Sequence, residues 1–114
     1  MTPEIGYKVL TAAQFEALLE GRFHGAPVDV ADGYTHLSTA GQLTETVREH
    51  FAGQTDLVIA AVDLTALGGA VKWEISRGGA EFPHFYGTLT MAHVIAHVPL
   101  AWNETGEIAL PAQR

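Results

Sequence analysis

Polar side chains recur at every second position of residues 34–38, the segment Tyr-Thr-His-Leu-Ser. Because side chains alternate across a β-strand, Tyr34, His36 and Ser38 share one face, and Leu37 suits a core on the other. A ring hydroxyl, an imidazole and a hydroxyl in a row can hydrogen-bond the hydroxyl groups of a ligand. This face is therefore expected either to be solvated or to line a pocket.

A second predicted strand, residues 71–76, carries a carboxylate at its middle. Alternation places the side chains of Val71, Trp73 and Ile75 inward and those of Lys72, Glu74 and Ser76 on the opposite side. If this strand is a neighbour of the first, His36 and Glu74 converge in one cleft. The sequence does not show that the two strands are adjacent.

A third group of candidates follows directly, in the segment from Arg77 to Gly87. Gly78 and Gly79 permit positive φ and a close approach of backbone to a ligand. Arg77 is the cation beside this loop and can bind a carboxylate or phosphate with two parallel hydrogen bonds. His84 and Tyr86 complete the set of candidate ligand contacts.

Each of these residues also has a purely structural interpretation. His36 could be a surface histidine or a core histidine that donates to a carbonyl, and Glu74 could form a solvated ion pair with Lys72 or Arg77. Tyr86 and Trp73 could be packing residues, and the Gly-Gly turn lacks phosphate-loop spacing. Both interpretations stay open on these residues alone.

Four histidines, His36, His84, His93 and His97, invite a metal-site interpretation because imidazole binds zinc, iron and nickel. The HExxH motif is absent, and the apolar neighbours of His93 and His97 favour strand packing. We therefore expect no metal cofactor. No nucleophile-elbow motif accompanies Ser38, and His24 and His50 are given no role.

The elements that must position these residues follow from periodicity and capping signals. Capping boxes at Thr11–Gln14 and Thr39–Gln42 predict two early helices. Strands are expected over residues 5–10, 34–38, 56–64, 71–76 and within 85–100, with the 56–64 strand central and a loop over 23–33. Helices early and strands late predict an α+β fold with antiparallel or mixed sheets.

Composition restricts the classes of function. The 114 residues carry 6 Lys+Arg against 13 Asp+Glu, a formal net charge of -7, which argues against nucleic acid and anionic membranes as partners. No cysteine, signal-peptide pattern or membrane-length apolar run is present, so a cytoplasmic location is expected. We expect one domain over residues 1–114, with a core over about 5–102 and a loosely held polar tail over 103–114.

Four motifs, taken in order, carry a resemblance: Asp32-Gly-Tyr-Thr-His-Leu-Ser38, His50-Phe-Ala-Gly53, Trp73-Glu-Ile-Ser-Arg-Gly-Gly79 and Phe82-Pro-His-Phe-Tyr-Gly87. Together they resemble the bacterial domain of unknown function 952 family, whose hallmarks are a DGYIHLS-like strand and an FPHLYG-like loop. The resemblance spans roughly residues 5–98. That family is grouped by fold with the ADP-ribosyltransferase-like proteins.

The resemblance implies a split, mostly antiparallel β-sheet with two early flanking helices and a nucleotide cleft between the sheet halves. It implies NAD or a related ribosyl nucleotide as ligand or substrate. His36 then matches the histidine that holds the ribose, Tyr86 or Trp73 the aromatic that stacks on nicotinamide, and Glu74 the later glutamate.

Within this resemblance His36, Glu74 and His84 are the candidate catalytic residues. The candidate ligand-binding residues are Tyr34, Ser38, Trp73, Ser76, Arg77, Gly78, Gly79 and Tyr86. Pyrophosphate would need Arg77 and loop amides, and the cations for that task are few.

Four functions compete. The first is an enzyme that processes NAD, and the second is a non-catalytic small-molecule sensor or binding module with the same fold. A relative of RNA 2′-phosphotransferases is disfavoured by the net charge and the few arginines, and a histidine-dependent metal hydrolase ranks last. Fold membership alone does not decide among them.

Overall fold

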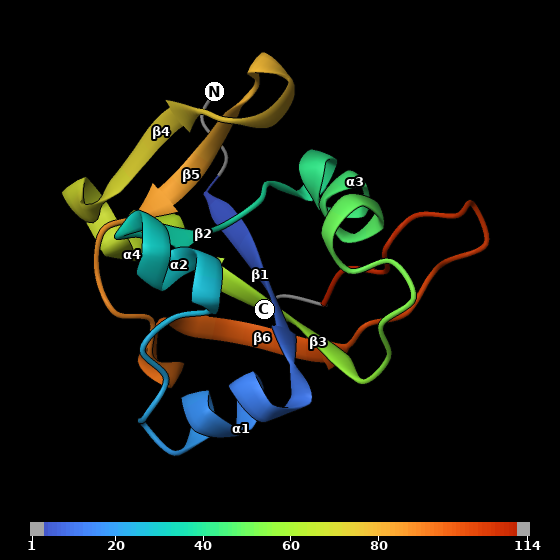
Figure 1. Cartoon of the computed structure of the whole chain (residues 1–114), viewed down its shortest axis with the longest axis horizontal. Helices are drawn as coiled ribbons and strands as arrows, with labels where there is room; N and C mark the ends of the chain where they lie inside the picture. The colour runs from blue at the N-terminus through green and yellow to red at the C-terminus, as the bar shows by residue number, and fades with distance from the viewer. Residues whose placement is uncertain (1–3, 112–114) are drawn as a thin grey trace.

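The computed structural model describes residues 4–111, except for the side chain of Arg77. Its strands form two three-stranded antiparallel sheets. The first sheet has the order β1 (Ile5–Thr11), β3 (Leu57–Asp63), β6 (Val94–Pro99), and the second β2 (Thr35–His36), β5 (Glu81–Phe85), β4 (Val71–Ile75) (Figure 1). The expected α+β class with mostly antiparallel strands is confirmed.

A backbone bridge joins the two sheets. Tyr7 on β1 and Ser38, just beyond β2, exchange backbone hydrogen bonds of 2.7 and 3.0 Å. Because β2 covers only Thr35 and His36, the strand expected over residues 34–38 is shorter than predicted. Beyond the Tyr7–Ser38 bridge β1 and β2 are not paired in the ladder, which leaves room for side chains between the sheets.

The central position expected for the 56–64 strand is confirmed, since β3 lies between β1 and β6. Ile59 and Ala61 belong to one buried cluster, and Ala60 and Val62 to another. Each face of β3 therefore packs against its own core, which is why this strand reads as apolar at nearly every position.

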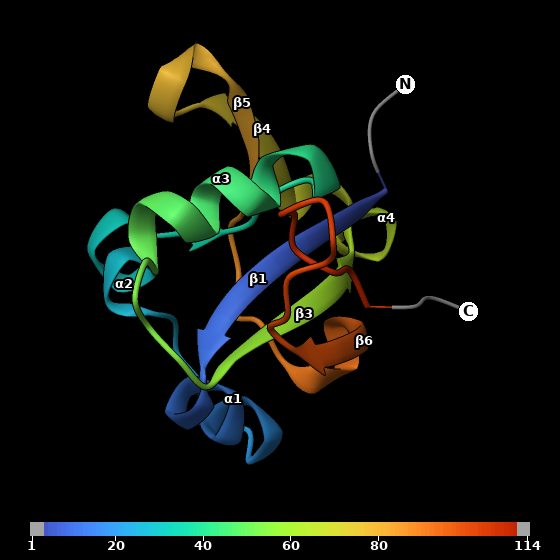
Figure 2. The ribbon, with the colours of Figure 1, turned by 90° about the vertical axis from the view of Figure 1, so that its right-hand side faces the viewer.

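Both predicted capping boxes begin helices. Thr11 precedes α1 (Ala12–Leu19) and Thr39 precedes α3 (Ala40–His50). A four-residue helix, α4 (Leu64–Leu67), follows β3 directly, and short 3-10 turns occupy residues 68–70, 77–79 and 91–93. Helix α3 lies along the sheet that contains β1 and β3, with the C-terminal segment beside it (Figure 2). Within residues 4–111 no helix has the length and apolar character that a membrane crossing requires.

The expectation of a loop over residues 23–33 is wrong, because this segment contains α2 (Pro27–Asp32). Pro27 supplies a φ suited to the first helical position, and the Asp29 carboxylate accepts from the Ala26 amide at 2.9 Å. Gly33, at φ 86°, ends the helix. Six residues are too few to show the apolar period by which a helix is recognised in a sequence.

Two further expectations need correction. Ile75, expected to point inward, is 71% exposed, because the β4–β5 hairpin extends past the core (Figure 1). The tail expected to be loosely held is fixed as far as residue 111: Ile108 is buried, its amide donates to Thr44 Oγ1 at 3.0 Å, and Arg48 donates to the Gly106 carbonyl at 2.6 Å. Residues 112–114 lie outside the described part.

Candidate functional site

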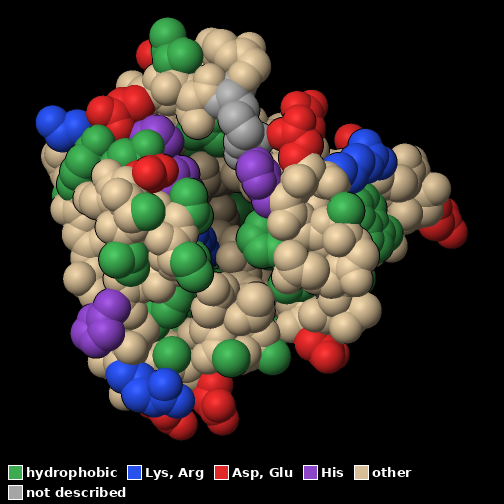
Figure 3. Space-filling model, viewed as in Figure 1, with side chains coloured by type: hydrophobic (Ala, Val, Ile, Leu, Met, Phe, Trp, Pro, Cys, Tyr) green, Lys and Arg blue, Asp and Glu red, His purple; other side chains and the backbone are tan. Residues whose placement is uncertain are grey.

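A cleft of about 590 Å³ opens between the two sheets and is bounded by the N-terminal ends of α1 and α2 and by α3. Figure 3 shows the hollow, with histidine side chains near its edge. Its polar wall includes Lys8, Asp32, His36, Ser38, Ser76 and His84, and its apolar wall includes Val9, Phe51 and Phe82. The volume and the mixed wall are typical of a small-molecule site.

The two histidines of this wall face each other across a strand pair. β2 and β5 are antiparallel, and their register places His36 directly opposite His84. The ring centroids are 5.4 Å apart. Cross-strand pairing therefore brings together two side chains that are 48 positions apart in the sequence.

Glu74 reaches this pair through His84. Its Oε1 accepts from His84 Nδ1 at 2.8 Å and from the Tyr86 hydroxyl at 2.7 Å. The hydrogen bond from His84, followed by that from Tyr86, lowers the pKa of Glu74. The hydrogen bond between Tyr86 and Glu74 also raises the pKa of Tyr86 to about 12. The predicted catalytic residues His36, Glu74 and His84 thus form one cluster, although β5 separates their outer strands and Glu74 does not itself line the cleft.

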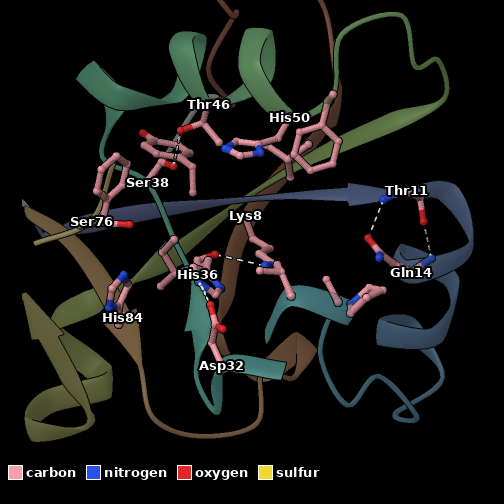
Figure 4. A pocket seen from close by; sticks show the side chains of 18 of the residues that line it. Lys8, Thr11, Gln14, Asp32, His36, Ser38, Thr46, His50, Ser76 and His84 are labelled. Carbon is pink, nitrogen blue, oxygen red and sulfur yellow. Dashed lines mark hydrogen bonds and ion pairs between the residues drawn. The ribbon is translucent and has the colours of Figure 1, made fainter. Parts of the chain in front are cut away.

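His84 leaves one atom for a ligand. Its side chain is 2% exposed, and Nε2 has no hydrogen-bond partner among the described residues. Because Nδ1 is held by Glu74, Nε2 is an acceptor in the neutral imidazole and a donor in the charged one. His84 belongs to the cleft wall, and Figure 4 shows its ring near His36.

His36 is held by a different carboxylate. Asp29 Oδ1 accepts from the His36 amide at 2.9 Å and from His36 Nδ1 at 2.8 Å, while His36 Nε2 lies 3.0 Å from Asp32 Oδ2. With a carboxylate at each nitrogen, both nitrogens donate when the ring is protonated. This pairing fixes the ring against α2.

Asp29 also binds a buried lysine. Lys8 Nζ lies 2.7 Å from Asp29 Oδ2 and donates to the His36 carbonyl at 3.1 Å. Burial raises the pKa of Asp29, but the hydrogen bonds from His36 and the charge of Lys8 outweigh it and hold that pKa at about 2. Burial lowers the pKa of Lys8, and the charge of Asp29 opposes that shift.

Tyr34 packs against both imidazoles from outside the cleft. Its ring stacks on His84 at 4.1 Å and lies 4.6 Å from the His36 ring. Burial, followed by the charges of Asp32 and Glu74, raises the pKa of its hydroxyl. Tyr34 thus fixes the ring positions of the pair, although it is not among the residues that line the cleft.

The other predicted ligand contacts divide into two groups. Ser38 and Ser76 line the cleft, and Ser38 Oγ lies 3.0 Å from Thr46 Oγ1. Trp73 packs against a core cluster instead. Gly78 and Gly79 have the predicted positive φ, at 69° and 77°, but are not among the lining residues. The side chain of Arg77 lies outside the described part.

Sequence reasoning missed Lys8, Asp29 and Asp32, which complete the polar network. Lys8 is the one charged residue in the apolar run from Ile5 to Leu10, and a charge inside a buried strand signals a buried partner. Asp29 and Asp32 were not identified as site residues, because the helix that positions them was expected to be a loop. His50, given no role, also lines the cleft.

The four histidines of the metal-site interpretation have other contacts. Among the described residues, no group of three or more histidine, cysteine or acidic side chains is arranged to hold a metal ion. His93 Nδ1 instead accepts from the Thr90 amide at 3.1 Å, and His97 packs against Phe15 at 4.7 Å between ring centroids.

Comparisons place this chain among known proteins. The crystal structure of protein CC0527 from Caulobacter crescentus, a structural genomics target, matches with a TM-score of 0.82 and 43% identity over 93% of this chain and 94% of that one. Its solution NMR structure matches with a TM-score of 0.76 and 43% identity over 90% of each chain. No match is found among curated proteins. The model of the family described as "Protein of unknown function (DUF952)" matches residues 9–97, and this chain belongs to that family.

Proposed function

We propose that the cleft binds a small ribosyl nucleotide of the NAD type. The observation that carries the proposal is the buried Nε2 of His84, which lies in the wall of a 590 Å³ cleft without a partner among the described residues. A buried polar atom left without a hydrogen bond costs about 1–3 kcal/mol, so a ligand group that binds it gains that energy.

The chemistry of the wall suits a ring joined to a sugar. Ser38, Ser76 and His84 offer hydrogen-bonding groups for ribose hydroxyls. Phe51 and Phe82 offer apolar surface for a base. The ADP-ribosyltransferase-like resemblance supports the same ligand class, because it implies a nucleotide cleft between two sheet halves.

A second candidate, binding without turnover, is favoured by the carboxylates. Cleaving a nicotinamide–ribose bond builds positive charge on the sugar, which a carboxylate facing the sugar would stabilise. Here Asp29 and Asp32 contact His36, and Glu74 lies behind His84 and accepts from it. Because Asp29 and Glu74 do not line the cleft, a sensor or binding module fits this wall as well as an enzyme does.

Calorimetric titration with NAD, ADP-ribose and nicotinamide riboside tests the binding proposal. We expect at least one of them to bind, and His84→Phe to weaken that binding at least about tenfold, because the phenyl ring fills the site of the imidazole but has no Nε2. The matched control is His97→Phe, on the exposed side of β6, which should bind like the wild type. No binding at millimolar ligand, or equal effects of the two variants, would overturn the proposal.

Turnover is a separate measurement on the same samples. Mass spectrometry after incubation with NAD detects free nicotinamide and ADP-ribose. Their appearance, and its loss in Glu74→Gln, would support an enzyme. Binding without any release would support the binding module.

A further inference from the structure

The charges of the cleft wall restrict which part of a ribosyl nucleotide enters it. Building on the proposed function, we infer that the cleft takes the nucleoside part, an uncharged or cationic base with its ribose, and leaves phosphate groups in the solvent. This inference rests on how the cations and the helix amides of the wall are already used.

Lys8 and His36 of the wall are each paired with a carboxylate. Among the described residues that line the cleft, Lys8 is the only lysine or arginine, and its Nζ lies 2.7 Å from Asp29 Oδ2. His36 lies between Asp29, at 2.8 Å, and Asp32, at 3.0 Å. A phosphate bound by these cations would have to displace a carboxylate from them.

Part of the backbone amides at the helix N-termini beside the cleft already donate to side chains of the protein itself. Backbone amides at such ends are the other common phosphate-binding groups. At α1, the Thr11 amide donates to Gln14 Oε1 at 2.9 Å and the Gln14 amide donates to Thr11 Oγ1 at 3.1 Å. At α2, the Ala26 amide donates to Asp29 at 2.9 Å, and Pro27 has no N–H.

The groups that remain are those a nucleoside uses. His84 Nε2 has no partner among the described residues, and Ser38 and Ser76 belong to the same wall. Asp32 belongs to the wall with a side chain that is 43% exposed, so its carboxylate favours a positively charged ring over a phosphate. A nicotinamide nucleoside has the positive ring and the ribose hydroxyls but no phosphate.

The test compares nicotinamide riboside, nicotinamide mononucleotide and inorganic pyrophosphate by calorimetry at low and high salt. We expect the riboside to bind at least as tightly as the mononucleotide, with little dependence on salt, and pyrophosphate not to bind. A mononucleotide or NAD affinity more than about tenfold above that of the riboside would overturn this inference and leave the proposed function standing. If none of these ligands, NAD included, binds, the proposed function fails and this inference with it.

Asp32→Asn gives a test by gain of affinity. The substitution removes the carboxylate charge on the cleft side of His36, so mononucleotide binding should tighten about tenfold relative to riboside binding. Glu104→Gln removes the same charge from the exposed C-terminal segment and should leave the ratio unchanged. An unchanged ratio in Asp32→Asn, or the same change in Glu104→Gln, would overturn the inference.

Discussion

The two carboxylate–imidazole pairs of the cleft are buried in opposite ways. In the first pair Asp29 is 3% exposed and His36 is 28% exposed, whereas in the second His84 is 2% exposed and Glu74 is 40% exposed. The buried carboxylate has partners on both oxygens, and the buried imidazole has one nitrogen without a partner among the described residues. A buried group with every partner supplied stabilises the fold, and a buried group with one partner missing is prepared for a ligand.

The first pair connects three elements. Asp29 on α2 holds Lys8 on β1 and His36 on β2, close to where the two sheets meet. The second pair lies within one sheet, with His84 on β5 and Glu74 on the neighbouring β4. We therefore expect substitutions in the first pair to act mainly on stability, and those in the second mainly on binding.

The largest expected effect is that of Lys8→Met. Removing the ammonium group leaves the Asp29 carboxylate buried with its charge uncompensated, which should lower the free energy of unfolding by about 3–5 kcal/mol in urea titration. Lys72→Met is the control, because Lys72 is exposed on β4, and it should cost less than about 1 kcal/mol. Equal losses in the two variants would show that the Lys8–Asp29 pair does not stabilise the fold.

The pH dependence of stability should identify Asp29. Its pKa is about 2 in the folded protein against an ordinary value of 3.8, so its ionised form stabilises the fold above pH 3.8 and this contribution is lost as the pH falls toward 2. The shift corresponds to about 2 kcal/mol. Unfolding measured from pH 6 to about 2 should show the difference between wild type and Asp29→Asn shrinking only below about pH 4. A difference that is constant across this range would assign the acid sensitivity to other groups.

His84→Phe should separate binding from stability. Although His84 is as buried as Asp29, the phenyl ring keeps the packing on Tyr34, and Glu74 is exposed enough to be hydrated. We expect a loss of about 1 kcal/mol in the free energy of unfolding, together with loss of ligand binding. A destabilisation as large as that of Lys8→Met would make the second pair structural too.

The smallest expected effect lies at the outer end of the second pair. Tyr86 has its pKa raised to about 12 by its hydrogen bond to Glu74, so the stabilisation from its neutral form is complete below pH 10 and is lost as the pH rises toward 12. Glu74→Gln removes the negative charge and should move this ionisation toward 10, followed by tyrosinate absorbance. The Tyr86→Phe variant shows which absorbance change belongs to Tyr86. An unchanged tyrosinate titration in Glu74→Gln would show that Glu74 does not raise the pKa of Tyr86.

The parts of the fold that repeat a pattern could be predicted. The capping boxes at Thr11 and Thr39 locate two helices, and the unbroken apolar run after Asp56 indicates a strand covered on both faces. Helix α2 could not be predicted, because its six residues are defined by Pro27 and by the partners of Asp29 rather than by a period. The buried position of Ile108 depends on its contact with Thr44 and on a buried cluster of side chains from β1, α3 and β3. These partners are far away in the sequence.

The site could be predicted only as far as strand alternation reaches. Alternation identified the polar face of His36 and Ser38 and the carboxylate of Glu74, but the strand order β2-β5-β4 is a property of the whole chain. That order decides that Glu74 meets His84 first. The polar network of Lys8, Asp29 and Asp32 could not be predicted, because a charged residue in an apolar strand indicates that a partner exists but does not indicate which residue it is.

The central claim is that His84 Nε2 is the atom that meets the ligand. The most direct measurement is an NMR titration of the ¹⁵N-labelled histidine rings with nicotinamide riboside. The account predicts that the Nε2 resonance of His84 shifts and saturates with the calorimetric affinity, while the resonances of His97 on β6 stay in place. Saturable binding that leaves His84 Nε2 unchanged would contradict it.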